Sequence, residues 1–433
     1  MTPAVLVLLA LVAVFVLIVL HVPIGISMVV VGVVAFAMMS NWNAALSLLS
    51  AEPASLLTSI DIGVIPLFLL MGSFATAGGL SDDIYRLAEV LLGHRRGGLG
   101  VATVLGCGLF GSIAGSSIAT TATFGRLALP QMRQRGYDPG FATGTIACGG
   151  TLGAMVPPSV ILVIYGIITE QFIIDLFIAA IIPACLAIVG YIFTIWLVTR
   201  LRPELAPTGP RATWAEIRVA LWRCRPVFLL FIAVSGGIYG GVFQVTEAAA
   251  LGAILTVLFA GLRGRLNGAV LVRALRETAA TTGMIYVAIF GASILSYFIG
   301  LTRVSDDLVL MLKGLDIPPL AVIFMLIVMY LVLGAVFDET AAMLVTLPFV
   351  LPVIVGFGYS PIWWGIINLV VINLGMVIPP IGLNVFLLHG LAVDVPIRSI
   401  YRGVMPFIAI DLVRLTILIL FPSLSLWLVQ ILK

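Results

Sequence analysis

Apolar residues dominate this chain in stretches that follow one another from near its start to near its end. A helix that spans a bilayer needs about 20 mostly apolar residues, so the chain has room for about a dozen spans joined by short loops. No sizeable soluble domain is therefore expected. The first stretch, residues 3–20, lacks a basic start and a small-residue cleavage site, and it is predicted to be a retained helix. The pattern predicts an all-α membrane protein.

Positive charge sets the expected orientation, because cytoplasmic loops of membrane proteins collect Lys and Arg. Basic residues gather in five segments, which we place in the cytoplasm: 95–96, 133–135, 200–225, 263–276 and 398–402. Other connections have few basic residues, and we place them outside: 41–61, near 170, near 244, and 303–318. With this assignment, the helical pairs 99–113/118–132 and 320–336/341–355 each begin and end on one side. Each pair is predicted to be a re-entrant hairpin.

One long polar linker, residues 200–225, divides the chain into two halves. Three prolines in its first part favour an extended backbone. The arginine pattern places this linker in the cytoplasm and starts the two halves on opposite sides of the membrane. We therefore predict two inverted repeats, residues 1–199 and residues 226–433.

Internal duplication supports the division. Shifting the first half by 222 positions (375 − 153 = 222) places Gly153 on Gly375. The same shift places Pro157–Pro158 on Pro379–Pro380, and it superposes two G-Y-x-P segments. Inverted repeats are common in transporters, because two such halves can exchange inward and outward shapes around one site.

The first polar motif, GSIAGSSIATTATFG at 111–125, lies at the turn of the first predicted hairpin. A helix break inside a bilayer is tolerated only where protein or a watery cavity satisfies the freed backbone groups. Such a break offers carbonyl oxygens to a cation and amide N–H groups to an anion. The alternative is a helix interface of small residues, since Gly111 and Gly115 have GxxxG spacing.

Two proline pairs define the second motif, GGTLGAMVPPS at 149–159 and NLGMVIPPIG at 373–382. Adjacent prolines remove two donors and disturb the preceding turn. We therefore expect two broken helices, unwound near Gly153 and near Gly375, with carbonyl oxygens released for a hard monovalent cation. The alternative is a simple kink in each helix.

The third motif, FDET at 337–340, falls on residues 115–118 under the repeat shift. Acidic residues inside membrane segments are costly and usually functional. The alternative is a hairpin tip that lies in open water. The polar side chains of the three motifs are candidate contacts for an anionic solute: Ser116, Ser117, Thr120, Asp338, Thr340 and Asn373.

Composition narrows the class of protein. Of the 433 residues, 62% are hydrophobic and 9% are charged, against about 25% charged in soluble domains. Neither lysine ends a G-x-x-x-x-G-K-[ST] loop, so an ATPase site of that type is absent. The three histidines are scattered and the four cysteines form no C-x-x-C pair, so no metal-ligand cluster is expected.

Two further features have structural interpretations. The acidic pairs Asp82–Asp83 and Asp306–Asp307 each follow a serine and are predicted to cap amphipathic surface helices. Several tryptophans lie near predicted span ends and are expected to anchor the membrane interface: Trp42, Trp214, Trp222, Trp363 and Trp364.

The motifs together resemble a known family. GSIAGSSIAT at 111–120, GGVFQVTEAAALGAI at 240–254, HVPIGISMVVVGVV at 21–34 and the G-x-x-x-P-P-x-G close at 375–382 are similar to the large membrane subunit of tripartite ATP-independent periplasmic (TRAP) transporters. The resemblance runs essentially end to end. It implies a sodium-driven importer of small organic anions, carboxylates or sugar acids, with an elevator-type moving domain in the bacterial inner membrane. It also implies two partners, a small four-helix membrane subunit and a periplasmic substrate-binding protein, and no nucleic acid.

The resemblance further implies two sodium (Na+) sites, each between a hairpin and the unwound helix that faces it, built mostly from backbone oxygens. The first site would use Ser112, Gly153, Val156 and Ser159. The second would use Gly334, Gly375, Ile378 and Ile381. This sequence has Ala114 where the family often has serine, and Ile378 where it often has threonine. Carbonyl or water oxygens would replace those side chains.

Other functions compete with this interpretation. A stand-alone sodium/dicarboxylate symporter has similar hairpins, and reconstitution of this chain alone would separate the two. An ion channel would need a continuous polar pore. An intramembrane enzyme would need a Ser–His or paired-Asp arrangement, and nothing in the sequence brings His389 to Ser116.

The predicted topology places the linker in the cytoplasm, because it is the most basic connection in the chain. A cysteine replacing Arg211, with the native cysteines changed to serine, should resist a membrane-impermeant thiol reagent added to intact cells. A cysteine replacing Glu170 should react under the same conditions. Efficient labelling at position 211 together with protection at 170 would invert the topology of both hairpins.

Overall fold

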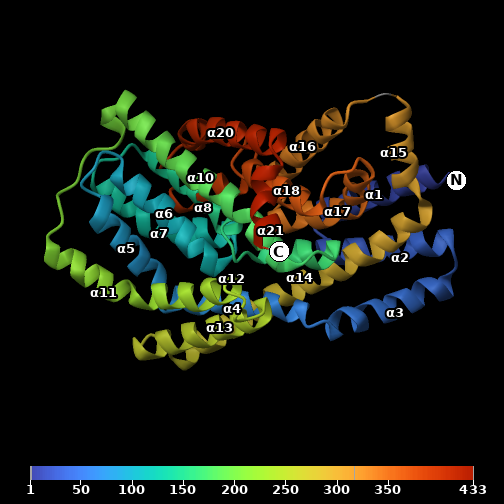
Figure 1. The fold of residues 1–433 in the computed structure, drawn as a ribbon, viewed down its shortest axis with the longest axis horizontal. Helices are drawn as coiled ribbons and strands as arrows, with labels where there is room; N and C mark the ends of the chain where they lie inside the picture. The colour runs from blue at the N-terminus through green and yellow to red at the C-terminus, as the bar shows by residue number, and fades with distance from the viewer. Residues whose placement is uncertain (1, 316, 433) are drawn as a thin grey trace.

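The computed structural model describes residues 2–315 and 317–432. Every regular element in these residues is a helix, which confirms the predicted all-α class (Figure 1). The helices of the first half are α1 (Pro3–Val19), α2 (Ile24–Met39), α3 (Trp42–Thr58), α4 (Val64–Ala77), α5 (Leu80–Leu92), α6 (Gly98–Ala114), α7 (Ser117–Gln134), α8 (Pro139–Met155), α9 (Val160–Thr169) and α10 (Ile173–Leu201). Those of the second half are α11 (Trp214–Phe231), α12 (Gly237–Tyr239), α13 (Val245–Leu262), α14 (Gly268–Thr302), α15 (Val304–Gly314), α16 (Pro319–Val336), α17 (Glu339–Gly356), α18 (Pro361–Gly375), α19 (Leu383–Leu391), α20 (Ile397–Leu420) and α21 (Ser423–Leu432).

Fewer helices span a membrane than the sequence pattern predicts. Among the described residues, six helices are long and apolar enough to cross a bilayer, or up to eight if each bent pair is one span. Several other apolar segments, including α1, α2, α6 and α18, fold as helices of 10–17 residues. The two arms of the second predicted hairpin, α16 and α17, are themselves among the six longer helices.

Two expected connections are partly helical, and one predicted helix is divided. The segment 41–61 contains α3, which is bent by 72° against the segment Asp61–Ala77. The second part of the linker is α11, which begins after a capping box formed by Thr213 and Glu216. The predicted helix at 404–432 is divided into α20 and α21. The repeat boundaries at 199 and 226 stay a prediction.

The acidic pairs lie in the first turns of α5 and α15, as predicted, but they do not cap these helices. Asp82 pairs with Arg265 at 3.2 Å, and Asp83 pairs with Arg263. Burial raises the pKa of Asp83 above its usual value, and the neighbouring Arg263 opposes that shift. The two pairs tie α5 to the loop after α13.

Two of the five tryptophans are not interface anchors. Trp363 and Trp364 are fully buried in the first turn of α18. The indole N–H of Trp363 donates to the carbonyl of Leu418 at 3.1 Å, and Trp364 packs edge-on against Tyr330 at 5.9 Å. The other three tryptophans are exposed, as an interface position requires.

Small residues let the long helices approach closely. Helix α14 runs beside α2 along one face of the molecule, with α3 outside them (Figure 1). A β-carbon on Gly291 would lie 2.7 Å from the carbonyl oxygen of Gly25, and one on Gly25 would lie 2.6 Å from the backbone of Ala288. Such contacts are typical of membrane helices, which associate by close packing rather than by a hydrophobic driving force.

This contact predicts a position-dependent effect along α14. Gly291→Ala should destabilise the protein by about 1–3 kcal/mol, because the added methyl group overpacks the α2 interface. The matched control is Gly283→Ala on the same helix, where an added β-carbon meets open space. Thermal unfolding in detergent measures both variants, and equal melting temperatures would contradict the close packing.

Candidate functional site

The first hairpin, α6–α7, lies against the broken helix α8–α9. Helix α8 ends at Met155, α9 begins at Val160, and the two are bent by 43° relative to each other. The proline pair lies in the residues between them, where its nitrogens provide no donors. The predicted break in this helix is therefore present in the structure.

Gly153 brings the backbone of α8 against the tip of the first hairpin. A β-carbon on Gly153 would lie 2.5 Å from the carbonyl oxygen of Ser116 and would collide with the Thr120 hydroxyl. A β-carbon on Gly111 would lie 2.5 Å from the Cα of Gly153, so the two backbones touch. The Thr120 Oγ1 atom is buried and has no hydrogen-bond partner among the described residues. A cation at the break would satisfy this oxygen.

The other predicted ligands of the first site retain acceptor capacity. The Ser112 hydroxyl donates to the carbonyl of Leu109 at 2.8 Å, and the Ser159 hydroxyl donates to that of Ala154 at 2.5 Å. A hydroxyl that donates still has lone pairs for a cation. Val156 follows α8 in an extended conformation, so its carbonyl leaves the helical hydrogen-bond pattern.

The second half repeats this arrangement between α16–α17 and α18–α19. Helix α18 ends at Gly375 and α19 begins at Leu383. A β-carbon on Gly375 would lie 2.8 Å from the Cα of Gly334, and one on Gly334 would lie 2.7 Å from the carbonyl of Ile372. Each half therefore packs a hairpin against a helix break through glycine.

The two breaks differ in the partners of their oxygens. The Gly375 carbonyl accepts from the amide of Ile378 at 3.0 Å, and the Ile381 carbonyl accepts from the Tyr401 hydroxyl at 2.7 Å. Each carbonyl has a second lone pair, so both oxygens can still contact a cation. The repeat equivalent of Tyr401 is Ala179 (401 − 222 = 179), which has no hydroxyl.

Both hairpin tips are closed by the same capping bond. The Ser116 hydroxyl accepts from the amide of Ala119 at 3.4 Å, and the Asp338 carboxylate accepts from the amide of Ala341 at 2.6 Å. The shift of 222 relates both partners of these bonds (338 − 116 and 341 − 119). Each bond satisfies one donor at a helix N-terminus, so Asp338 has a structural role in its hairpin.

The two tips meet through Ser117 and Glu339, the first residues of α7 and α17. The amide of Ser117 donates to Glu339 Oε1 at 3.3 Å. The side-chain amide of Asn384 donates to the Ser117 hydroxyl at 2.9 Å and to the carbonyl of Ala147 at 3.3 Å. These buried contacts link both hairpins to both broken helices.

A cavity of 880 Å³ lies in front of both tips, with further walls from α4, α9 and α14. Its lining includes Ser116, Asp338 and Thr340 of the predicted solute contacts. Arg126 and Arg273 also line it, and neither has an ion-pair partner among the described residues. A guanidinium group presents donors that match a carboxylate. The same lining also includes the carboxyl groups of Glu277, Asp338 and Glu339, so the two guanidinium groups are the part of this wall that can bind an organic anion.

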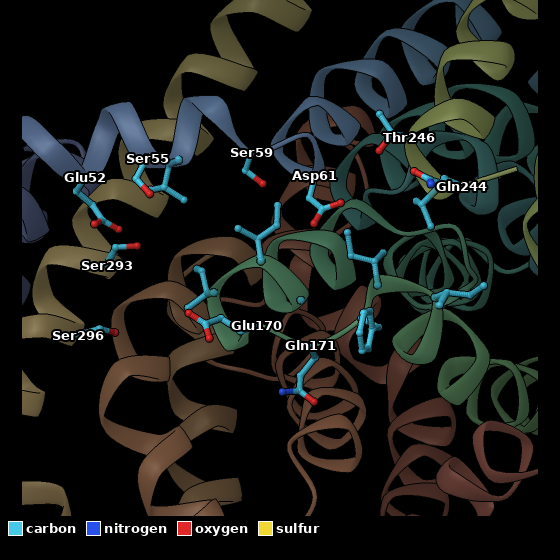
Figure 2. A pocket seen from close by; sticks show the side chains of 18 of the residues that line it. Glu52, Ser55, Ser59, Asp61, Glu170, Gln171, Gln244, Thr246, Ser293 and Ser296 are labelled. Carbon is cyan, nitrogen blue, oxygen red and sulfur yellow. The ribbon is translucent and has the colours of Figure 1, made fainter. Parts of the chain in front are cut away.

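A larger cavity of 1410 Å³ lies elsewhere, beside α3, α9 and α14 (Figure 2). Its acidic residues are Glu52, Asp61, Glu170 and Glu247, and the described residues of its lining include no Lys or Arg. In Figure 2, Glu52 and Ser293 lie on neighbouring helices, and Glu170 lies at the end of α9. None of the predicted sodium or solute residues lines this cavity. No basic side chain among its described lining residues balances these acids, so we do not place the anionic solute there.

The remaining predicted solute residues lie away from the cavity walls. Ser117 and Thr120 are buried behind the tips, and Thr120 faces the first break instead. Asn373 is buried within α18, where its side-chain amide donates to a carbonyl of the same helix at 3.0 Å. The structure therefore does not place these three residues on the wall of the cavity.

Sequence reasoning missed Arg126, Arg273 and Asn384. The signal for Arg126 was a charge inside a predicted hairpin segment. For Arg273 the sequence carries no signal, because the nearby Arg276 has the same charge and only the structure shows which one lines the cavity.

A buried ion pair on α20 contacts the end of α8. Arg414 pairs with Asp411 at 2.9 Å, and the Tyr191 hydroxyl donates to the same carboxylate at 2.6 Å. The Arg414 guanidinium also lies 3.2 Å from the sulfur of Met155, the last residue of α8. The cluster therefore connects α10 and α20 to the last residue of α8.

Comparison with known proteins identifies the family of the chain. The family model described as "Tripartite ATP-independent periplasmic transporter, DctM component" matches residues 11–424. The chain belongs to this family. As a DctM-family protein it is a multi-pass membrane permease and one component of a tripartite transporter.

Two curated relatives and one solved structure illustrate the similarity. The C4-dicarboxylate TRAP transporter large permease protein DctM of Pseudomonas aeruginosa is 33% identical over 367 residues, 84% of each chain. The sialic acid TRAP transporter large permease protein SiaM of Vibrio cholerae is 27% identical over 411 residues, 94% of this chain and 95% of the relative. The structure of the Alcanivorax borkumensis YdaH transporter matches with a TM-score of 0.63 at 17% identity, covers 89% of both chains, and supports the fold alone.

Proposed function

We propose that this DctM-family permease imports a small organic anion in symport with sodium ions. The observation that carries the proposal is the meeting of two repeat-related hairpin tips, each packed on a broken helix, at the wall of a cavity with two unpaired arginines. An anion in this cavity contacts helix N-termini and guanidinium groups. The freed oxygens behind the tips suit cations.

The sodium sites are proposed at the two breaks. The first combines the Ser112 and Ser159 hydroxyls and the Val156 carbonyl with the break at Gly153, and the unpartnered Thr120 hydroxyl is added to it. The second uses the carbonyls of the corresponding segment: Gly334, Gly375, Ile378 and Ile381. The described residues contain no cluster of three or more His, Cys, Asp or Glu, so a ligand set of neutral oxygens fits a monovalent ion.

The proposed solute is a carboxylate or sugar acid. Relatives named for a C4-dicarboxylate and for sialic acid share the family, and both names denote carboxylate-bearing solutes. Ser116, Asp338 and Thr340 at the cavity wall, with Arg126 and Arg273, are the proposed contacts. Arginine supplies the charge that a carboxylate requires in a cavity of low dielectric constant.

An elevator motion in the bacterial inner membrane is proposed, with the hairpins and broken helices moving against α1–α4, α13 and α14. By the arginine pattern, the cavity at the tips opens to the cytoplasm and the acidic cavity opens outside. The proposed partners are a small four-helix membrane subunit and a periplasmic binding protein. Exposed apolar residues along α1, such as Leu8 and Val16, offer a face for the membrane partner. The alternative is a stand-alone sodium/dicarboxylate symporter.

Sodium coupling is tested with the chain reconstituted in liposomes together with both partners. Uptake of succinate and of sialic acid should rise steeply with external sodium, because two sites must fill. Gly153→Val and Gly375→Val should each abolish uptake, since a β-branched side chain cannot fit against the hairpin. Uptake that ignores sodium would exclude the coupling ion. Full-rate uptake by the chain alone would favour the stand-alone symporter.

The role of the cavity arginines is tested with a pair of neighbouring substitutions on α14. Arg273→Gln should raise the KM for uptake about tenfold, the effect of losing a hydrogen bond to a charged group. Arg276→Gln is the matched control, because Arg276 is exposed and does not line the cavity. Equal KM values for the two variants would show that the solute binds elsewhere.

A further inference from the structure

Glu339 extends from one hairpin to the helix N-terminus of the other. It is the first residue of α17, and its Oε1 atom accepts from the backbone amide of Ser117, the first residue of α7, at 3.3 Å. The first amides of a helix lack partners inside the helix and carry partial positive charge. The Glu339 carboxyl group therefore occupies a position that favours an anion.

The surroundings of this carboxyl group do not explain its burial. Glu339 is 6% exposed, and its Oε2 atom has no hydrogen-bond partner among the described residues. None of the ion pairs in the described part of the chain includes it. A carboxyl group buried in a membrane protein without a cationic partner is costly and usually functional. Its small exposed fraction faces the cavity in front of the tips.

We propose that the Glu339 carboxyl group is an internal stand-in for the solute, held at the N-terminus of α7 where a carboxylate of the transported anion binds. The proposal rests on the proposed function, because it assumes that the solute binds at the tips. Before the solute arrives, the contact between Glu339 and Ser117 joins the two hairpins. An entering carboxylate takes the Ser117 amide and displaces Glu339.

Competition is the physical consequence. A backbone amide has a single N–H, so the Ser117 amide does not donate fully to two carboxyl groups at once. The apparent affinity for the solute is therefore lower than the hairpins alone would give. The displaced side chain remains beside a cavity that also holds Arg126 and Arg273, either of which offers it donors.

The competition between Glu339 and the solute is tested by removing the Glu339 carboxyl group. Glu339→Ala should lower the KM for succinate or sialic acid about two- to tenfold, the range expected from one net hydrogen bond. Glu204→Ala, an exposed glutamate in the linker, is the matched control and should leave KM unchanged. A KM that rises in Glu339→Ala, or uptake lost by a correctly folded variant, would show that Glu339 assists the solute and would overturn the proposal.

A second measurement does not depend on the identity of the solute. In the purified complex, acetate should raise the melting temperature of Glu339→Ala, because it fills the vacated anion position, and acetamide of the same size should not. Wild type and Glu339→Gln, in which acetate must first displace the side chain at position 339, should respond much less to acetate than Glu339→Ala. An equal response to acetate and acetamide, or no response, would overturn the proposal. If uptake fails and the acetate response persists, the proposed solute is wrong and the anion position stands.

Discussion

Every backbone amide and carbonyl at membrane depth needs a hydrogen-bond partner. At the two helix breaks, some of these groups have no partner within their own helix. Each break coincides with a proline pair. A glycine of each broken helix, Gly153 or Gly375, lies in contact with the backbone of the facing hairpin. The freed oxygens therefore face protein and not lipid. The positions of the hairpins, the cavity and the proposed ions all depend on this pairing of break and hairpin.

The hairpin tips extend the same constraint to the centre of the protein. Two helices, α7 and α17, begin there with unpaired amides, and capping by Ser116 and Asp338 satisfies one donor in each. Ser117 and Glu339 then connect the tips directly, and Asn384 connects them to the second broken helix. A short series of buried contacts therefore joins the two halves at the tips.

The two cavities differ in their basic residues. Both have acidic side chains on their walls, but among the described lining residues only the cavity at the tips also has arginines, Arg126 and Arg273. An anionic solute is therefore better matched to the cavity at the tips. The Glu339 carboxyl group and the Tyr401 hydroxyl each place one polar side chain at the tips or at the second break.

The sequence by itself determined the helical membrane class, both hairpins, both breaks and the equivalence of the two halves, because length, proline and glycine act locally. It did not determine the helix α3, the burial of Trp363 and Trp364, or the placement of Thr120 against Gly153. Only tertiary structure decided that Arg273 and not Arg276 lines the cavity, and that residues 222 positions apart share a hydrogen bond. Those facts depend on which helix faces pack together, and an almost uniformly apolar chain carries little local signal for that choice.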